Sequence, residues 1–395
     1  MPTDLANRVL DHLDKNRTAM FELLERLVVC ESPSGDRSAL KEVITMLSAS
    51  FVERRFRPQV VKGKDSGGML LAMPADRLHH RPRQLILGHC DTVWPVGTLE
   101  TMPARTDDEG VFWGPGSYDM KAGLVQGLFA VEALAAAGAD PLPVTPVFFI
   151  NSDEEIGSHD STRVIVRLAR GADRCFVLEP SLGPEGNLKT ARKGVGSFSI
   201  TVRGVAAHAG LDPGKGASAI LELSLIIQKL FALNDLDRGI TVNVGTIDGG
   251  LSPNMVAPES KAAIDVRVPT REDAKHIEQA IHSLQAETPG TEVIVEGSVR
   301  RPPMERTPGN QRLWRLAQRG AEELGIEIEQ AAAGGGSDGN TTSLFAPTLD
   351  GLGAVGAGAH ALNEHLILDR MVERSALLAR LLSYPPLDEA MPRDA

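Results

Sequence analysis

The 395-residue chain has few cysteines, few aromatic residues and no long apolar run. Its three cysteines, Cys30, Cys90 and Cys175, are widely spaced, which argues against a disulfide framework and favours a cytoplasmic location. No apolar run approaches the roughly 20 residues that span a bilayer. Residues 1–26 form a charged amphipathic pattern without the apolar core of a signal peptide. We therefore expect a protein that neither spans a membrane nor depends on disulfides.

An excess of positive charge is also missing. The chain has 41 Lys and Arg residues against 52 Asp and Glu residues, a formal net charge of -11 at pH 7. This charge argues against nucleic acid or an anionic membrane as the main partner. The remaining composition, 42% apolar and 24% charged, is ordinary for a globular protein, and the length suggests two domains.

The first half of the sequence alternates short apolar runs with helical patterns. The runs at 84–87, 147–150 and 175–178 have the length and composition of buried strands. Helices are expected at 4–29, 38–51, 120–137 and 161–168. This alternation is typical of the α/β class, with a mixed, largely parallel sheet wrapped by helices.

The middle of the chain has a different pattern. Strands are expected at 197–203, 240–247, 260–268 and 292–299, with helices at 217–233 and 271–287. The order β-α-β-β-α-β is that of a ferredoxin-like α+β domain, with one antiparallel sheet and two helices on one face. We therefore expect an inserted domain at 190–302, within a discontinuous catalytic domain made of 1–189 and 303–395.

Histidine and carboxylate residues follow the apolar runs at the points where the runs stop. His89 and Asp91 follow the first run, Glu154 and Glu155 the second, and Glu179 the third. Parallel strands bring their carboxyl ends to one edge of a sheet, where such folds gather their chemistry. Converging carboxylates repel one another without a cation, so the pattern predicts a metal site.

The spacing suggests different tasks for these residues. His89 suits a metal ligand, and Asp91, on the same side of the strand end, suits the carboxylate that orients its ring. Of the adjacent Glu154 and Glu155, one would bind the cation and the other act as a general base. The alternatives are a His–Asp pair in a capped turn, the acidic first turn of a helix, and, for Glu179, an exposed loop carboxylate.

Two further candidates lie outside the strand ends. Asp119 directly precedes a helical pattern, and His360 ends a stretch rich in glycine and alanine. The ordinary use of Asp at such a position is an N-cap. His360 alone would equally suit a core or loop histidine, so the metal hypothesis depends on the whole set of residues.

Six segments then carry a resemblance to a known family. They are residues 88–92, 114–123, 153–158, 179–180, 207–210 and 358–364. Their motifs and order resemble the dinuclear metallohydrolase superfamily that includes carboxypeptidase G, acetylornithine deacetylase, succinyl-diaminopimelate desuccinylase and the aminoacylases. Because the segments extend over most of the chain, the resemblance applies to the whole protein.

The resemblance implies two divalent metal ions, usually zinc, with cobalt or manganese able to substitute. It assigns His89, Asp119 and Glu179 to one ion. It assigns Asp119, Glu155 and His360 to the other, so that Asp119 bridges the two.

The same resemblance implies the remaining roles near the metals. Glu154 would be the general base and Asp91 a catalytic residue that orients His89. A cis peptide bond is expected between Asp119 and Met120.

The inserted domain resembles the family's lid and dimerisation domain, so a homodimer is expected. His208 would stabilise the oxyanion formed from the substrate carbonyl. Asn254 and Arg267 would contact the substrate, with Arg267 gripping a carboxylate through two hydrogen bonds. Gly335 and Gly336 lie in a glycine-rich loop whose backbone N–H groups suit the same carboxylate. Arg267 could alternatively be an exposed strand residue.

The implied reaction is hydrolysis of an amide bond next to a free carboxylate, in a small peptide or an N-acyl amino acid. The motifs most resemble the glutamate carboxypeptidase branch, which releases a C-terminal acidic residue. The alternative is a deacylase of N-acetyl or N-succinyl amino acids. A relative that only binds its ligand, without activity, would lack a metal ligand or the general base, and this sequence has all of them. A structural zinc site would be richer in cysteine.

Overall fold

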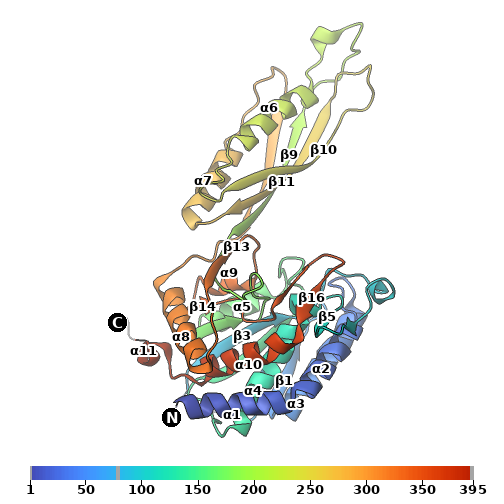
Figure 1. Ribbon diagram of the computed structural model, residues 1–395. Coiled ribbons are helices and arrows are strands. Elements are labelled where there is room, and N and C mark those ends of the chain that lie inside the picture. The colour runs from blue at the N-terminus through green and yellow to red at the C-terminus, as the bar shows by residue number, and fades with distance from the viewer. Residues whose placement is uncertain (1, 77–80, 392–395) are drawn as a thin grey trace. The chain divides into compact units, whose positions relative to one another are not determined.

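A computed structural model describes residues 2–76 and 81–391, which form two compact units (Figure 1). Unit 1 comprises the chain up to Thr190, Arg306–Ala332, and the chain from Ser337 onward, and unit 2 comprises Ala191–Glu305 with Ala333–Gly336. The sequence-based boundaries placed 303–305 and 333–336 in the catalytic domain. The structure assigns them to unit 2, because the Lys193 N–H bonds the Ala333 carbonyl (3.0 Å) and Met304 pairs with Arg192.

A six-stranded sheet forms the centre of unit 1. Its spatial order is β1 (Phe56–Val61), β2 (Met69–Pro74), β6 (Thr145–Asn151), β3 (Arg83–His89), β7 (Arg174–Val177) and β14 (Thr348–Leu349). The last four strands are mutually parallel, while β1 and β2 form an antiparallel edge. The expected mixed, largely parallel sheet is therefore confirmed.

Both faces of this sheet are buried, because alternate residues of each strand point to opposite faces. Ile86, Phe148 and Phe176 belong to the large core formed with the helices of one face. Leu85 and Val147, one position away on the same strands, belong to a smaller core. Burial on both faces explains why these strands are continuous apolar runs in the sequence.

Helices cover both faces of the sheet (Figure 1). The large core includes residues of α1 (Pro2–Lys15), α2 (Arg17–Val29), α3 (Arg37–Glu53), α4 (Ala122–Ala136), α8 (Pro308–Leu324) and α10 (Leu368–Ser383). Residues of α5 (Thr162–Ala169) pack in the smaller core. Two short helices, α9 (Asp338–Thr342) and α11 (Leu387–Ala390), complete the unit.

Two local features shape the helices of unit 1. The helix expected at 4–29 is divided at Asn16, whose side-chain amide donates to the His12 carbonyl (2.8 Å) and competes with the backbone pattern. Gly123 lets α4 approach β7 closely, because a Cβ there would lie 2.0 Å from the carbonyl oxygen of Leu178.

Two small sheets are separate from the central sheet. One sheet has the order β15 (Gly356–Ala357), β16 (His365–Ile367), β5 (Val111–Trp113) and β4 (Arg105–Thr106). A second pairs β8 (Leu188–Arg192) with β13 (Gln330–Ala333). These strands were not predicted from the sequence, since each has only two to five residues.

Unit 2 is an antiparallel sheet with the order β10 (Thr241–Gly249), β11 (Glu259–Val268), β9 (Gly194–Arg203) and β12 (Glu292–Arg301). The helices α6 (Ala219–Phe231) and α7 (Arg271–His282) pack in one apolar cluster with Phe198, Ile200 and Val202 of β9. Both helices therefore cover the same face, as the β-α-β-β-α-β pattern predicts (Figure 1).

The secondary structure differs from the prediction at two further places. The strands β1 and β2 were not predicted; β1 is an edge strand in which three of six residues are exposed and Pro58 lies near the centre. The helix expected at 271–287 ends at His282, and the N–H groups of Glu287 and Thr288 instead donate to the buried Glu222 carboxylate.

In the described residues, no helix has both the length and the apolar character needed to cross a membrane.

Candidate metal centre

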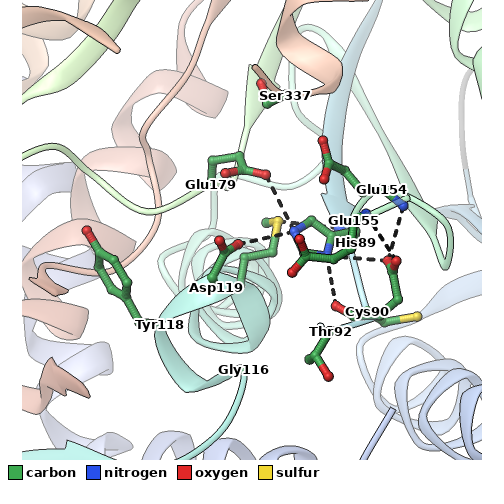
Figure 2. Close-up of polar contacts among 12 residues, drawn as sticks. His89, Cys90, Thr92, Gly116, Tyr118, Asp119, Glu154, Glu155, Glu179 and Ser337 are labelled. Atoms are coloured by element: carbon green, nitrogen blue, oxygen red, sulfur yellow. Dashed lines mark hydrogen bonds and ion pairs between the residues drawn. The ribbon is translucent and has the colours of Figure 1, made fainter. Parts of the chain in front are cut away.

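The strand ends of unit 1 bring the predicted residues together (Figure 2). His89 is the last residue of β3, and its neighbour in register is Asn151 at the end of β6. Glu154 and Glu155 follow β6, and Glu179 follows β7 by two residues. This is the carboxyl edge of the parallel strands, where the sequence pattern predicts a site.

His89 lies at the centre of the cluster and is almost fully buried. Its Nε2 atom lies 3.2 Å from Asp119 Oδ1 and 3.5 Å from Glu179 Oε1 (Figure 2). Its Nδ1 atom lies 3.0 Å from the Asp91 carbonyl oxygen and 3.4 Å from Asp91 Oδ1. When His89 is neutral, an Nδ1–H donated to Asp91 leaves Nε2 as a lone-pair donor facing Asp119 and Glu179.

Asp119 lies between the two histidines. Its Oδ1 atom faces His89, and its Oδ2 atom lies 3.6 Å from His360 Nε2. The residue sits in a turn over Ser117–Lys121, and the Asp119–Met120 peptide bond is cis, as the family resemblance implied. The helix α4 begins at Ala122 with Lys121 in the N-cap position, so Asp119 is not the N-cap of α4.

His360 and Glu155 form the second half of the cluster. His360 Nε2 lies 3.0 Å from Glu155 Oε2, and the backbone of His360 has a positive φ of 60°. The other oxygen, Glu155 Oε1, is buried and has no hydrogen-bond partner among the described residues. Burial raises the pKa of Glu155, and the Glu155 carboxylate in turn raises the pKa of His360 to about 9.

Glu154 also approaches His89. Two sets of three side chains in the described residues offer ligand atoms within 4.8 Å of one another: His89, Asp119 and Glu155, and His89, Glu154 and Glu179. These sets differ from the two predicted from family resemblance, which left Glu154 away from the metals. The geometry therefore gives Glu154 access to the same space as Glu179.

The chemistry of this donor set suits divalent metal ions. Burial opposes a charge on His89, yet Asp119, Asp91 and Glu179 together raise its pKa well above the usual value. The surrounding carboxylates thus favour a positive charge at this position, and a divalent metal ion supplies more positive charge than a proton on His89 does. The buried Glu155 Oε1 atom, which has no hydrogen-bond partner among the described residues, also fits the role of a metal ligand. Imidazole and carboxylate ligands without cysteine fit zinc and also other divalent ions.

Asp91 holds the loop that carries the two adjacent glutamates. Its Oδ1 atom accepts the backbone N–H of Glu154 at 3.3 Å, and its Oδ2 atom accepts that of Glu155 at 3.2 Å. Ser34 donates its hydroxyl to the same Oδ2 atom at 2.8 Å. Asp91 therefore contacts both His89 and the Glu154–Glu155 segment, which is a broader role than orienting the ring of His89.

Glu364 is a buried residue that the sequence analysis did not select. Its carboxylate accepts the backbone N–H groups of Gly116, Tyr118 and Asp119 at 2.9 to 3.0 Å, and also the indole N–H of Trp94 at 2.8 Å. Burial raises the pKa of this carboxyl group. Its position in the segment 358–364, four residues after His360, was the available sequence signal.

The remaining candidates belong to unit 2. His208 is exposed, and its Nδ1 atom accepts the backbone N–H groups of Gly210 and Leu211, each at 3.1 Å. A neutral His208 therefore carries its proton on Nε2, which is the form that can donate to a carbonyl oxygen. Asn254 is also exposed, and Ser252 donates its hydroxyl to Asn254 Oδ1 at 2.5 Å.

Arg267 and the glycine-rich loop have partners within unit 2. Arg267 donates through Nε and Nη2 to the two carboxylate oxygens of Asp265, at 2.9 and 3.0 Å. The bidentate hydrogen bonding that was expected between Arg267 and a substrate carboxylate is thus made with Asp265. Arg192, which the sequence analysis did not select, donates to the carbonyl oxygens of Gly335 and Gly336, at 3.2 and 3.3 Å.

Comparison with known proteins gives a family match. Residues 85–384 match the model of peptidase family M20/M25/M40. The chain is similar to carboxypeptidase G2 of Pseudomonas sp. (strain RS-16), with 26% identity over 374 residues, covering 92% of this chain and 88% of the relative. It is also similar to succinyl-diaminopimelate desuccinylase of Acidovorax ebreus (strain TPSY), with 31% identity over 304 residues, covering 71% and 75%.

Solved structures share the fold. The aminopeptidase PepT of Bacillus cereus ATCC 10987 has a TM-score of 0.79 at 22% identity, covering 93% of this chain and 98% of the other. An M20 family metallo-carboxypeptidase from Sulfolobus solfataricus has a TM-score of 0.71 at 18% identity, covering 92% and 98%. The similar proteins thus include peptidases and a deacylating enzyme.

Proposed function

The chain belongs to peptidase family M20/M25/M40, and on that premise we propose that it is a metal-dependent amidohydrolase that cleaves an amide bond next to a free carboxylate. The observation that carries this proposal is the position of Asp119, with His89 at one carboxylate oxygen and His360 at the other. A carboxylate between two histidines, with further carboxylates beside each, is the arrangement expected of a two-metal site.

The ligands of two divalent ions would come entirely from unit 1. His89, Asp119 and Glu179 would hold one ion, and Asp119, Glu155 and His360 the other. Zinc is the metal that we expect, with cobalt or manganese as substitutes. When bound, such ions make water more acidic and polarise a carbonyl oxygen.

Glu154 would act as the general base. One of its carboxylate oxygens would take a proton from the attacking water and later return a proton to the leaving amine. Its approach to His89 and Glu179 supports this role, because a base must lie within reach of the water that it activates. The same approach makes a ligand role the competing assignment, and metal content of a Glu154 variant separates the two.

Unit 2 would supply the groups that bind the substrate. The Nε2–H of His208 would donate to the oxygen on which negative charge develops, and the tautomer fixed by the Gly210 and Leu211 N–H groups supports this role. Asn254 would contact the substrate. Arg267 would bind a substrate carboxylate only by sharing or exchanging its pairing with Asp265.

The glycine-rich loop is the second candidate for the substrate carboxylate. Arg192 holds the carbonyl oxygens of Gly335 and Gly336, which favours a loop that presents its N–H groups to an anion. In the reaction proposed above, the carboxylate that this loop would bind is the one adjacent to the scissile amide in the substrate itself. The expected substrate is therefore a small peptide or an N-acyl amino acid with a free carboxylate.

A glutamate carboxypeptidase-like exopeptidase remains our first choice of activity, supported by the match to carboxypeptidase G2 along 92% of the chain. The alternative is a deacylase of N-acyl amino acids, supported by desuccinylase relatives such as that of Acidovorax ebreus at 31% identity. The two activities differ in whether the larger part of the substrate lies on the acyl side or on the amine side of the scissile amide.

We also propose a homodimer formed through unit 2. Ile220, Leu221 and Phe231 of α6 are 48%, 53% and 50% exposed, and Ile247 on the edge strand β10 is 67% exposed. An edge strand with a neighbouring apolar helix face is a surface that a second copy can extend and cover. Sedimentation of the protein with and without Phe231→Asp would test this assembly; a monomeric parent protein would contradict it.

The activity is tested by loading metal-free protein with zinc, cobalt or manganese and assaying dipeptides and N-acyl amino acids with varied C-terminal residues. We expect hydrolysis only after loading, loss of hydrolysis when the C-terminal carboxylate is amidated, and preference for a C-terminal acidic residue. Preference for N-acetyl or N-succinyl groups regardless of that residue would favour the deacylase. Absence of metal-dependent hydrolysis across the panel would contradict the proposal.

A further inference from the structure

Asp338 is a buried carboxylate outside the metal cluster. It is the first residue of α9 and is 4% exposed. Its Oδ2 atom accepts the side-chain N–H of Asn151 at 2.8 Å, and its Oδ1 atom accepts the hydroxyl of Ser158 at 2.5 Å. The cap of α9 is provided by Ser337, so the Asp338 carboxylate is directed to residues of another segment.

The two donors flank the segment that carries Glu154 and Glu155. Asn151 is the last residue of β6, pairs in register with His89, and accepts the Cys90 N–H through its carbonyl oxygen at 2.9 Å. Its side chain thus ties the end of the central sheet to Asp338.

Ser158 is the donor on the other side of the segment. Its N–H donates to the Asp153 carbonyl at 2.7 Å, which closes a tight loop around the two glutamates. Ser158 has a φ of 54°, a left-handed conformation that costs a residue with a side chain and persists when neighbouring contacts hold it. The hydrogen bond to Asp338 is such a contact.

We propose that Asp338 is a positioning residue that sets the placement of Glu154 and Glu155 by holding both ends of their loop. The consequence for catalysis rests on the function proposed above, while the effect on the loop does not. Asp91 accepts hydrogen bonds from the N–H groups of Glu154 and Glu155 within this loop. Asp338 instead accepts hydrogen bonds from the side chains on either side of it. A misplacement of about 1 Å in a reacting group costs about 100-fold in rate.

The test compares the parent protein with Asp338→Asn, in which an amide group replaces one acceptor oxygen by a donor. Amide hydrogen exchange is measured for a peptide spanning 153–161, in metal-free and metal-loaded protein. We expect exchange in this peptide to be about tenfold faster or more, because a buried charged acceptor is lost. In the loaded enzyme, kcat should fall by about 10- to 100-fold while KM changes less than about threefold.

Asp173→Asn is the matched control. Asp173 is likewise a carboxylate that accepts a hydrogen bond from a distant segment, the backbone N–H of Leu387 at 3.1 and 3.2 Å, but it precedes β7 at the edge of the sheet away from the metal cluster. This variant should leave exchange in 153–161 and kcat unchanged. If Asp338→Asn does not fold, Ser158→Ala removes the same hydrogen bond from the loop side and takes its place.

A double variant, Asp338→Asn with Ser158→Ala, separates positioning from general stability. If Asp338 acts through Ser158, the two effects on kcat are not additive. Unchanged exchange in 153–161, or equal changes with Asp173→Asn, would overturn the proposal. If the parent protein hydrolyses no substrate, the proposed function fails, and hydrogen exchange still decides whether Asp338 holds the loop.

Discussion

His360 Nε2 lies 3.0 Å from Glu155 Oε2. The Glu155 carboxylate raises the pKa of His360 from the usual 6.5 to about 9, so His360 is protonated at neutral pH in the metal-free protein. Metal ions need the neutral imidazole, so this proton must leave when metal binds. The pairing of these two residues therefore makes metal uptake depend on pH.

We expect metal binding at pH 7 to release protons and the apparent affinity to fall as the pH is lowered. Calorimetric titration of metal-free protein with zinc, in buffers with different ionisation enthalpies, measures the proton release. Release should diminish as the pH is raised through about 9, because His360 becomes neutral above that pH. Proton release that is independent of pH between 7 and 10 would contradict the assigned pairing.

The same pairing predicts the pH dependence of stability in the metal-free protein. Because the folded-state pKa of His360 is raised, its contribution is fully present below about pH 6.5 and is lost as the pH rises through about 9. His360 is half exposed, so the contribution should be small. Urea unfolding of the metal-free parent protein and of His360→Gln across this range tests the sign: as the pH rises, the parent protein should lose more stability than the variant, because His89 is still present in both.

Asp91→Asn should lower kcat by about 10- to 100-fold, because residues that support metal ligands have effects of that size. The amide would place a donor against the N–H groups of Glu154 or Glu155, which both donate to Asp91. KM should change little, because substrate contacts are not altered. Steady-state kinetics with metal analysis checks this expectation; a change in KM alone would contradict the role of Asp91 in holding the loop.

Glu364→Gln should weaken metal binding by about 10- to 100-fold and destabilise the protein by about 1–3 kcal/mol. The reason is that the amide cannot accept all of the N–H groups of Gly116, Tyr118, Asp119 and Trp94. Zinc competition with a chelator and denaturant unfolding measure the two effects. Normal zinc affinity together with lowered stability would restrict Glu364 to a structural role.

Gly123→Ala should destabilise the protein by about 1–3 kcal/mol, because the added Cβ would lie 2.0 Å from the Leu178 carbonyl oxygen. Gly35→Ala is the matched control, since a Cβ at Gly35 meets no atom within 4 Å. Thermal unfolding of the two variants tests the close packing of α4 on β7. Equal stability of both variants would contradict it.

Apolar runs and strand-end residues allowed prediction of the central sheet and of the segments that meet at its edge. His89 and Glu179 could be selected because they lie where apolar runs end, whereas Asp119 could be selected only through its family motif. Glu364 and Asp338 could not, because their importance depends on backbone N–H groups and side chains distant in sequence. The pairing of Arg267 with Asp265 could not be predicted either. The sequence shows that the two residues lie on the same side of a strand, but it does not show which rotamers their side chains adopt.

The central claim is that the protein hydrolyses an amide bond with metal ions held by His89, Asp119 and their neighbours, and with Glu154 as the base. The most direct measurement combines kcat and bound zinc for Glu154→Gln. The account predicts a loss in kcat of about 100- to 10,000-fold with zinc content equal to that of the parent protein. Retained activity, or loss of zinc together with activity, would contradict the assignment of Glu154 as the base.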